Sequence, residues 1–274
     1  MAPTLVVMAA GLGSRFGGTK QLVGVGPRGE AFLDFAVGDA RAAGVDQVVM
    51  IVRTDIQADV ERHLGRFCAD VPITMVRQDE LGPHRAKPWG TAHAILSAAE
   101  VIDSAFLVVN ADDYYGTIGY QLGVETLRTH PDDAALVAFR LANTLPTVGA
   151  VSRGVCAADD GYLVELVETH GIARADDGVI RSEDPVGEHA DDTMVSMNMW
   201  AFPTSILDQL SARWPTWLEA HGDQEKSEFL LPSVVDELRA DGELRVRVLE
   251  SPDRWVGVTN PDDLEPAREA LADR

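Results

Sequence analysis

A glycine-rich turn that directly follows a short apolar run constrains this chain more than any other feature. Residues 5–8 have the composition of a buried strand, and the chain continues as AAGLGSRFGGTK. Glycine lacks a Cβ and tolerates positive φ, so Gly11 and Gly13 let backbone N–H groups approach an anion closely. Arg15 and Lys20 add positive charge. The pattern predicts a polyphosphate-binding loop that is neither a Walker loop nor GxGxxG, the alternative being an ordinary turn.

The first half of the chain alternates strand-like and helix-like segments. Helices are expected at 32–40, 55–66 and 91–101, and strands at 48–52, 73–76 and 106–109. This alternation is typical of a parallel sheet with helices on both faces. Beyond Pro131 the expected segments are strands at 135–139, 148–155, 162–167, 194–202 and 244–249, and helices at 203–212, 228–240 and from Pro261 onward.

We therefore predict an α/β fold, a Rossmann-like three-layer sandwich with a mostly parallel central sheet and a small mixed β extension. No repeat or low-complexity linker divides the chain, so residues 1–274 are expected to form a single domain with halves at about 1–130 and 131–274. Ligands of open α/β sheets bind at the carboxyl ends of strands, where Gly11 and Asn110 are expected.

Charge and composition exclude several classes of partner. The net charge is −21, from 44 acidic and 23 basic residues, and such a field repels nucleic acid and anionic membranes. It also repels nucleotides, so a triphosphate needs local cations. No apolar run approaches the ~18 residues that span a bilayer, and no signal peptide is recognisable. We expect a cytoplasmic protein with no nucleic acid or membrane partner.

Two further composition features lead to expectations. Cys68 and Cys156 belong to no disulfide or zinc spacing and are expected to be buried free thiols. Residues 175–193 are rich in acidic side chains, which predicts an exposed loop.

A second candidate motif follows the apolar strand at 106–109. Asp112 should emerge at the same sheet edge as the glycine-rich loop. Mg²⁺ prefers one or two carboxylates and otherwise keeps water and phosphate oxygens, so one aspartate beside a polyphosphate loop is enough to hold it. The alternative is an aspartate that caps a turn. For Asp113 both roles remain open.

These motifs resemble those of the sugar-1-phosphate nucleotidyltransferase superfamily, the nucleotide-sugar pyrophosphorylases, whose signature is GxGxR followed by lysine. GLGSR and Lys20 match it, and the four residues between Arg15 and Lys20 are similar to the spacing in molybdenum-cofactor nucleotidyltransferases. Asn110-Ala-Asp112 is similar to the family's metal-binding GD motif. The resemblance also implies nucleotide contacts at Ala9, Ala10, Gly11, Gly13 and Ser14.

Later motifs extend the resemblance. WGTAHA looks like the LGTGHA segment of uridylyltransferases acting on N-acetylglucosamine 1-phosphate, which implies that Gly90 and Thr91 contact the nucleoside. LVE is similar to the IxEK segment, which implies that Glu168 contacts the sugar, with Thr169 in place of the lysine. MNM is similar to the NxG motif, which implies that Asn198 binds the sugar.

The last motifs depart further from the family. SEFLLPSVVDEL keeps step with a pattern of glucose-1-phosphate uridylyltransferases, which implies that Glu228 supports the sugar site. WVGVTNPDDL resembles WxDxGTxxxL, but Gly257 stands where a second metal aspartate is expected. A related motif, GVNNRLQL, uses an asparagine as metal ligand, which implies Asn260, with Thr259 as the alternative.

The acceptor-site lysine missing at Thr169 has three candidate replacements, His170, Arg174 and Lys226, of which Lys226 is taken as an acceptor contact. An exposed, solvated lysine is the simpler interpretation of Lys226. Trp200, Trp255 and His93 are expected to be core residues.

Together the resemblance implies Mg²⁺-dependent transfer of NMP from an NTP to a sugar 1-phosphate, with Arg15, Lys20 and Asp112 catalytic. The first half of the chain would bind nucleotide, and the second, with the β extension, would form the acceptor lobe. Alternatives are a cytidylyltransferase acting on a phosphorylated alcohol such as phosphocholine, a glycosyltransferase, and a noncatalytic nucleotide-binding module. UTP or dTTP is mildly preferred, whereas the sugar and the oligomeric state, a homo-oligomer included, stay open.

Overall fold

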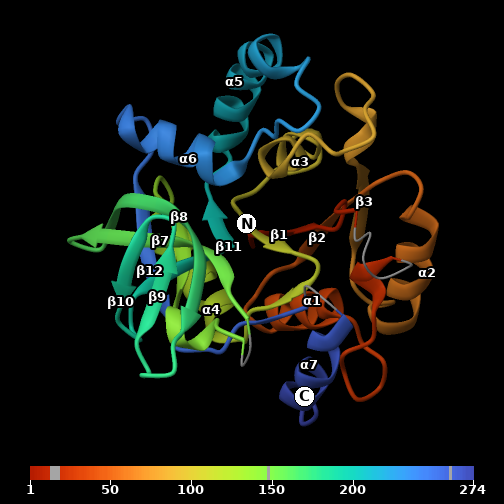
Figure 1. The fold of residues 1–274 in the computed structure, drawn as a ribbon. Coiled ribbons are helices and arrows are strands. Elements are labelled where there is room, and N and C mark those ends of the chain that lie inside the picture. Colours follow the sequence, from red (N-terminus) through yellow and green to blue (C-terminus); the bar gives the residue numbers. More distant parts are fainter. Residues whose placement is uncertain (13–18, 147–148, 259–260) are drawn as a thin grey trace.

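The computed structural model describes residues 1–12, 19–146, 149–258 and 261–274. These residues form one eleven-stranded sheet in the order β10-β9-β8-β12-β6-β11-β4-β1-β2-β3, with β7 beside β8 and β11 (Figure 1). Its strands are β1 (Thr4–Met8), β2 (Gln47–Val52), β3 (Ile73–Arg77), β4 (Phe106–Asn110), β6 (Ala134–Arg140), β7 (Val151–Asp159), β8 (Tyr162–Arg174), β9 (Ile180–Glu183), β10 (Val186–His189), β11 (Met194–Phe202) and β12 (Val246–Ser251). A separate two-stranded sheet pairs β5 (Asp113–Tyr114) with β13 (Val256–Gly257).

The main sheet is mixed rather than mostly parallel, which corrects the expectation. Strands β3, β2, β1 and β4 pair in parallel, as do β6 and β12. The other described pairings, among β4, β6 to β12, are antiparallel. No helix separates β7, β8, β9 and β10, so short turns join these successive strands into antiparallel pairs. The antiparallel pairing of β11 with β4 and β6 instead joins segments distant in the chain.

Helices cover both faces of the sheet (Figure 1). They are α1 (Phe32–Ala42), α2 (Gln57–Phe67), α3 (Thr91–Ser97), α4 (Ile118–Thr129), α5 (Ser205–His221), α6 (Leu231–Ala240) and α7 (Leu264–Ala270). Side chains alternate along β1, so Leu5 and Val7 belong to the core beneath α1, α2 and α4, whereas Val6 and Met8 belong to the core beneath α3, α5 and α6. Of the described helices, none has the length and apolar character that crossing a membrane requires.

Three segments differ from their expected structure. The acidic segment at 175–193 contains the β9–β10 hairpin, because Ile180 is buried and Arg181 pairs with Asp177 and Glu188. Helix α5 extends well beyond residue 212, since its apolar positions continue to the buried Trp214. The helix expected from Pro261 begins as a 3₁₀ turn before α7.

Both cysteines are free, as expected. Cys68 is buried in the core, whereas Cys156 is only partly buried.

Candidate active site

The loop after β1 lies at the same sheet edge as the acidic turn, as expected. Strands β1 and β4 are parallel neighbours with Met8 opposite Asn110. The side chain of Arg53, just beyond the neighbouring strand β2, donates to the carbonyls of Ala10 and Gly11, both at 2.7 Å. These two hydrogen bonds hold the start of the loop against the end of β2. The predicted residues Gly13, Ser14 and Arg15 lie outside the described residues.

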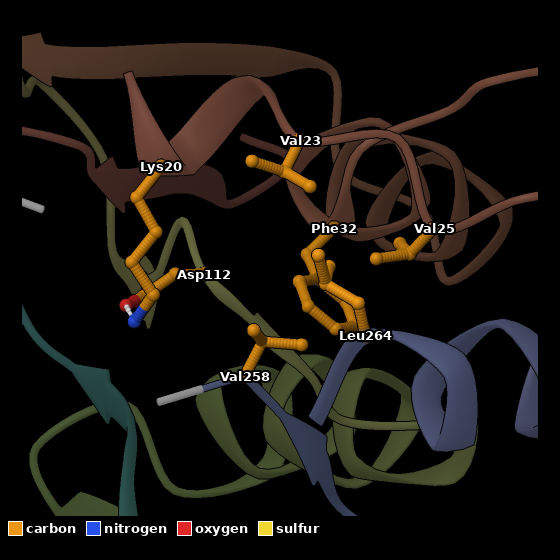
Figure 2. A pocket seen from close by; sticks show the side chains of 7 residues that line it. All are labelled: Lys20, Val23, Val25, Phe32, Asp112, Val258 and Leu264. Carbon is orange, nitrogen blue, oxygen red and sulfur yellow. Dashed lines mark hydrogen bonds and ion pairs between the residues drawn. The ribbon is translucent and has the colours of Figure 1, made fainter. Parts of the chain in front are cut away.

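Lys20 and Asp112 meet across the two loops. Lys20 begins a 3₁₀ turn, η2 (Lys20–Leu22), and its Nζ lies 2.6 Å from Oδ2 of Asp112. Figure 2 shows the two side chains pointing toward one another. Their side chains are 16% and 34% exposed, so a ligand can reach the pair, Asp112 more easily. The rest of this small pocket is apolar and is lined by Val23, Val25, Phe32, Val258 and Leu264.

The same loop is anchored by a second side chain. Gln21, in η2, donates from Nε2 to the carbonyl of Gly11 at 2.7 Å. The position of Lys20 is therefore tied to the loop after β1 through its immediate neighbour.

The carboxylates at this edge suit a hard divalent cation that takes most of its ligands from the substrate and from water. Among the described residues, no group of three or more His, Cys, Asp or Glu side chains could hold a metal. Asp112 nevertheless offers a partly exposed carboxylate at the same sheet edge as the loop after β1, and Mg²⁺ needs only one or two carboxylates when phosphate oxygens are present. The residues present therefore fit Mg²⁺. The predicted ligand Asn260 and its alternative Thr259 lie outside the described residues.

Gly257 cannot be exchanged for the aspartate that the family motif carries there. It lies opposite Asp113 in the β5–β13 pair. A Cβ at Gly257 would overlap the Trp255 ring and come within 2.9 Å of Oδ1 of Asp113. The Trp255 ring therefore occupies the space that a carboxylate at position 257 would need, and Trp255 itself packs against the core as expected.

Asp113 follows Asp112, is partly buried and is held by its neighbours. Asn110 Nδ2 donates to its Oδ2 at 2.7 Å, and the Tyr115 hydroxyl donates to the same oxygen at 3.2 Å. Burial, reinforced by the charge of Asp112, raises the pKa of Asp113 to about 7. Asp113 is therefore tied to Asn110 and Tyr115, and both roles expected for it stay predictions.

Asn198 occupies a β-bulge in β11, where the register shifts between Ser196 and Met199. Its φ is 63°, a left-handed conformation that asparagine tolerates better than most residues. Its Nδ2 donates to Oδ1 of Asn110 at 2.9 Å, and its Oδ1 accepts from Nε1 of the fully buried Trp200, also at 2.9 Å. The bulge therefore aims Asn198 at the acidic turn, and Trp200 is a core residue as expected.

A cleft of about 750 Å³ brings several of these side chains together. We call it the main cleft; its lining includes Thr91, Asn110, Asp113, Arg153, Glu168 and Asn198. Of the residues predicted from the later motifs, Thr91, Glu168 and Asn198 thus share one cavity. Its walls also carry Asp236 and Glu237 from α6, so carboxylates outnumber the single basic residue among the described lining residues.

Gly90 allows a close approach between two segments. Its φ is 111°, and a Cβ there would lie 2.5 Å from the carbonyl oxygen of Phe229. Thr91, the first residue of α3, accepts through Oγ1 from the N–H of Leu231, at 2.9 Å. The two residues therefore join α3 to the start of α6, and their contact with a nucleoside stays a prediction.

Other predicted acceptor residues do not line the main cleft. Lys226 is exposed before α6, and Glu228 forms an ion pair with Lys87. Of the other candidates for the missing lysine, His170 is bonded to Ser152 Oγ and Arg174 pairs with Asp191. The structure brings none of these side chains to the lining of the cleft.

Three functional candidates were missed in the sequence, namely Gln21, Arg53 and Arg153. Arg53 directly follows β2, so its place at the ligand-binding edge could have been predicted from the strand pattern. Gln21 and Arg153 belong to no motif, and only the folded chain shows their contacts.

Comparisons with known proteins identify the family and the fold. Residues 5–160 match the model of the MobA-like NTP transferase domain. The bifunctional protein GlmU of Staphylococcus epidermidis is 26% identical over 273 residues, covering 98% of this chain and 52% of the relative. The chain thus spans about half the length of the curated relatives it matches. A structure described as a glucose-1-phosphate thymidylyltransferase of Bacillus anthracis, in complex with sucrose, shares the fold at 14% identity, with a TM-score of 0.70 over 100% of this chain and 96% of the other.

Proposed function

Because the chain belongs to the family of MobA-like NTP transferase domains, we propose that it transfers an NMP from an NTP to the phosphate of a sugar 1-phosphate. The products are an NDP-sugar and pyrophosphate. The observation that carries the proposal is the Lys20–Asp112 pair, beside a phosphate-binding loop and one residue before Asp113 in the main cleft. The pair supports the proposal because a cation and a carboxylate suited to Mg²⁺ would then lie near a cavity large enough for a second substrate.

The reaction asks little covalent chemistry of the protein. An oxygen of the acceptor phosphate attacks the α-phosphorus, and the bond from that phosphorus to the departing pyrophosphate breaks. The nucleophile is already an anion, so no general base is needed, and rate enhancement comes from alignment and charge neutralisation. Lys20, with Arg15, holds the β- and γ-phosphates and the departing pyrophosphate. Asp112, with Asn260 as second ligand, would hold Mg²⁺, which would supply positive charge to the phosphates.

The remaining residues position the two substrates. The backbone from Ala9 to Gly11, together with Gly13 and Ser14, contacts the nucleotide. Gly90 and Thr91 contact its nucleoside part. Glu168 and Asn198 both line the main cleft, where they can bind the hydroxyl groups of the acceptor. Glu168 accepts hydrogen bonds from these hydroxyls, and Asn198 donates or accepts them. Lys226 and Glu228 remain predictions without a place in that lining.

The names of relatives select the first substrates to test. One structural neighbour is described as a glucose-1-phosphate thymidylyltransferase, so glucose 1-phosphate with dTTP and with UTP is the first choice. We therefore propose glucose 1-phosphate as the sugar phosphate and dTTP or UTP as the nucleotide.

A second candidate acceptor is a phosphorylated amino alcohol such as phosphocholine, with CTP as donor. The observation that favours it is the acidic lining of the main cleft, where Glu168, Asp236 and Glu237 would attract a cationic head group.

The experiment is pyrophosphate release with Mg²⁺ from ATP, CTP, GTP, UTP and dTTP, each with glucose 1-phosphate, other sugar 1-phosphates or phosphocholine. Asp112→Asn should abolish release, whereas Asp59→Asn, an exposed aspartate on α2, should leave it unchanged. Release with CTP and phosphocholine alone would select the second candidate. NTP binding without release for any pair would instead indicate a noncatalytic nucleotide-binding module.

A further inference from the structure

Arg153 is the single basic side chain among the described residues that line the main cleft. It lies on β7, directly opposite Thr169 of β8. Thr169 stands where the resembling motif carries a lysine, but it is buried, and its hydroxyl donates to the carbonyl of Val167. The cross-strand neighbour therefore supplies a positive charge where Thr169 cannot.

The guanidinium of Arg153 is held in place by the protein. Its Nη2 donates to the carbonyl of Thr144 at 2.7 Å, its Nε to Thr144 Oγ1 at 3.2 Å and its Nη1 to the carbonyl of Ser152 at 2.8 Å. It also lies over the Trp255 ring, 4.8 Å from the ring centre. Guanidinium carries five N–H donors, so these bonds leave donors on both terminal nitrogens for a ligand.

The charge of Arg153 is not neutralised by an ion pair. Among the described residues no carboxylate forms a salt bridge with it, although Asp113 and Glu168 are near enough to raise its pKa. Burial outweighs them and lowers the pKa of Arg153 to about 10, so it remains charged at neutral pH. An oriented, half-buried guanidinium with terminal donors to spare is suited to a phosphate, which it can bind through two parallel hydrogen bonds.

We infer that Arg153 binds the phosphate of the acceptor, in place of the lysine that Thr169 replaces. The inference rests on the proposed nucleotidyl transfer for the identity of that phosphate. It also gives the acidic cleft of a strongly negative protein the cation that an anionic acceptor needs. An acceptor phosphate at Arg153 would lie in the cleft that Asp113 also lines, and Asp113 directly follows Asp112 in the chain.

The test compares Arg153→Gln and Arg153→Lys with the unsubstituted protein. Arg140→Gln is the matched control, because Arg140 ends strand β6, is exposed, forms an ion pair with Glu250 and is absent from the described lining of the main cleft. Steady-state kinetics gives separate KM values for glucose 1-phosphate and for the NTP. A ³¹P NMR titration measures binding of glucose 1-phosphate and of phosphocholine without turnover, so it reports on Arg153 even if no transfer is found.

Loss of one charged hydrogen-bond donor should raise the acceptor KM and Kd of Arg153→Gln about 10- to 100-fold. The KM for the NTP should stay within about threefold, and Arg153→Lys should recover part of the loss. A merely structural role would instead lower thermal stability and change both KM values together. Equal acceptor binding by Arg153→Gln and the unsubstituted protein, or no binding of either phosphate to the unsubstituted protein, would overturn the inference.

Discussion

Replacement of Lys20 by glutamine should separate catalysis from folding. The substitution removes the ammonium that lies 2.6 Å from Asp112, while a side chain of similar size remains. Removal of one preorganised donor to a developing charge costs about 2.7–4 kcal/mol, or a 10²- to 10³-fold loss of kcat. The ion pair is partly exposed, and such pairs contribute about 0–1 kcal/mol to the free energy of unfolding. Activity should therefore fall far more than stability.

The assay is coupled pyrophosphate release at saturating substrates, together with urea unfolding of the same preparations. Arg62→Gln is the matched control, because Arg62 forms a pair of similar length, 2.7 Å, with Asp59 on the exposed face of α2. It should leave kcat unchanged. If Lys20→Gln keeps kcat within about threefold of the unsubstituted enzyme, the assignment of Lys20 to the phosphates is wrong.

Three further predictions concern the buried framework. Gly90→Ala should destabilise the protein by at least about 1–3 kcal/mol in urea unfolding, because of the positive φ and the contact with Phe229; an unchanged midpoint would contradict this. Burial lowers the pKa of His93 to about 4 from 6.5, so its share of stability is full above pH 6.5 and about 3 kcal/mol is lost as pH falls to 4. His93→Gln should flatten the unfolding free energy over that range, and an identical pH profile would refute the assignment. Burial raises the pKa of both Cys68 and Cys156 to about 12, so the native protein should react with a thiol reagent at pH 8 far more slowly than the unfolded chain, and equal rates would contradict it.

Much of the first half of the chain could be predicted because its pattern is local. Apolar runs and helical spacing locate β1, β2, β3 and β4 with α1 and α2 between them, and strand ends locate the glycine-rich loop and Asp112 at one edge. That edge arrangement follows from parallel pairing alone.

The second half could be predicted only in part because its pairing is not local. Hydropathy alone does not show that β11 lies antiparallel between β4 and β6, or that a bulge aims Asn198 at Asn110. The acidic segment before β11 is predicted as a loop because it is rich in acidic residues. In the structure it forms a hairpin in which Arg181 pairs with Asp177 and Glu188. Arg153 was missed because its candidate role depends on its position opposite Thr169, which only the strand register shows.

The most direct test of nucleotidyl transfer is identification of the products after incubation with an NTP, glucose 1-phosphate or another phosphorylated acceptor, and Mg²⁺. Mass spectrometry and ³¹P NMR of one reaction would follow both phosphate products. We predict a nucleoside monophosphate joined to the phosphate of the acceptor, and pyrophosphate in equal amount, both absent with Asp112→Asn. Release of nucleoside diphosphate and inorganic phosphate without a joined product would contradict it, because the bond at the α-phosphorus would then be intact.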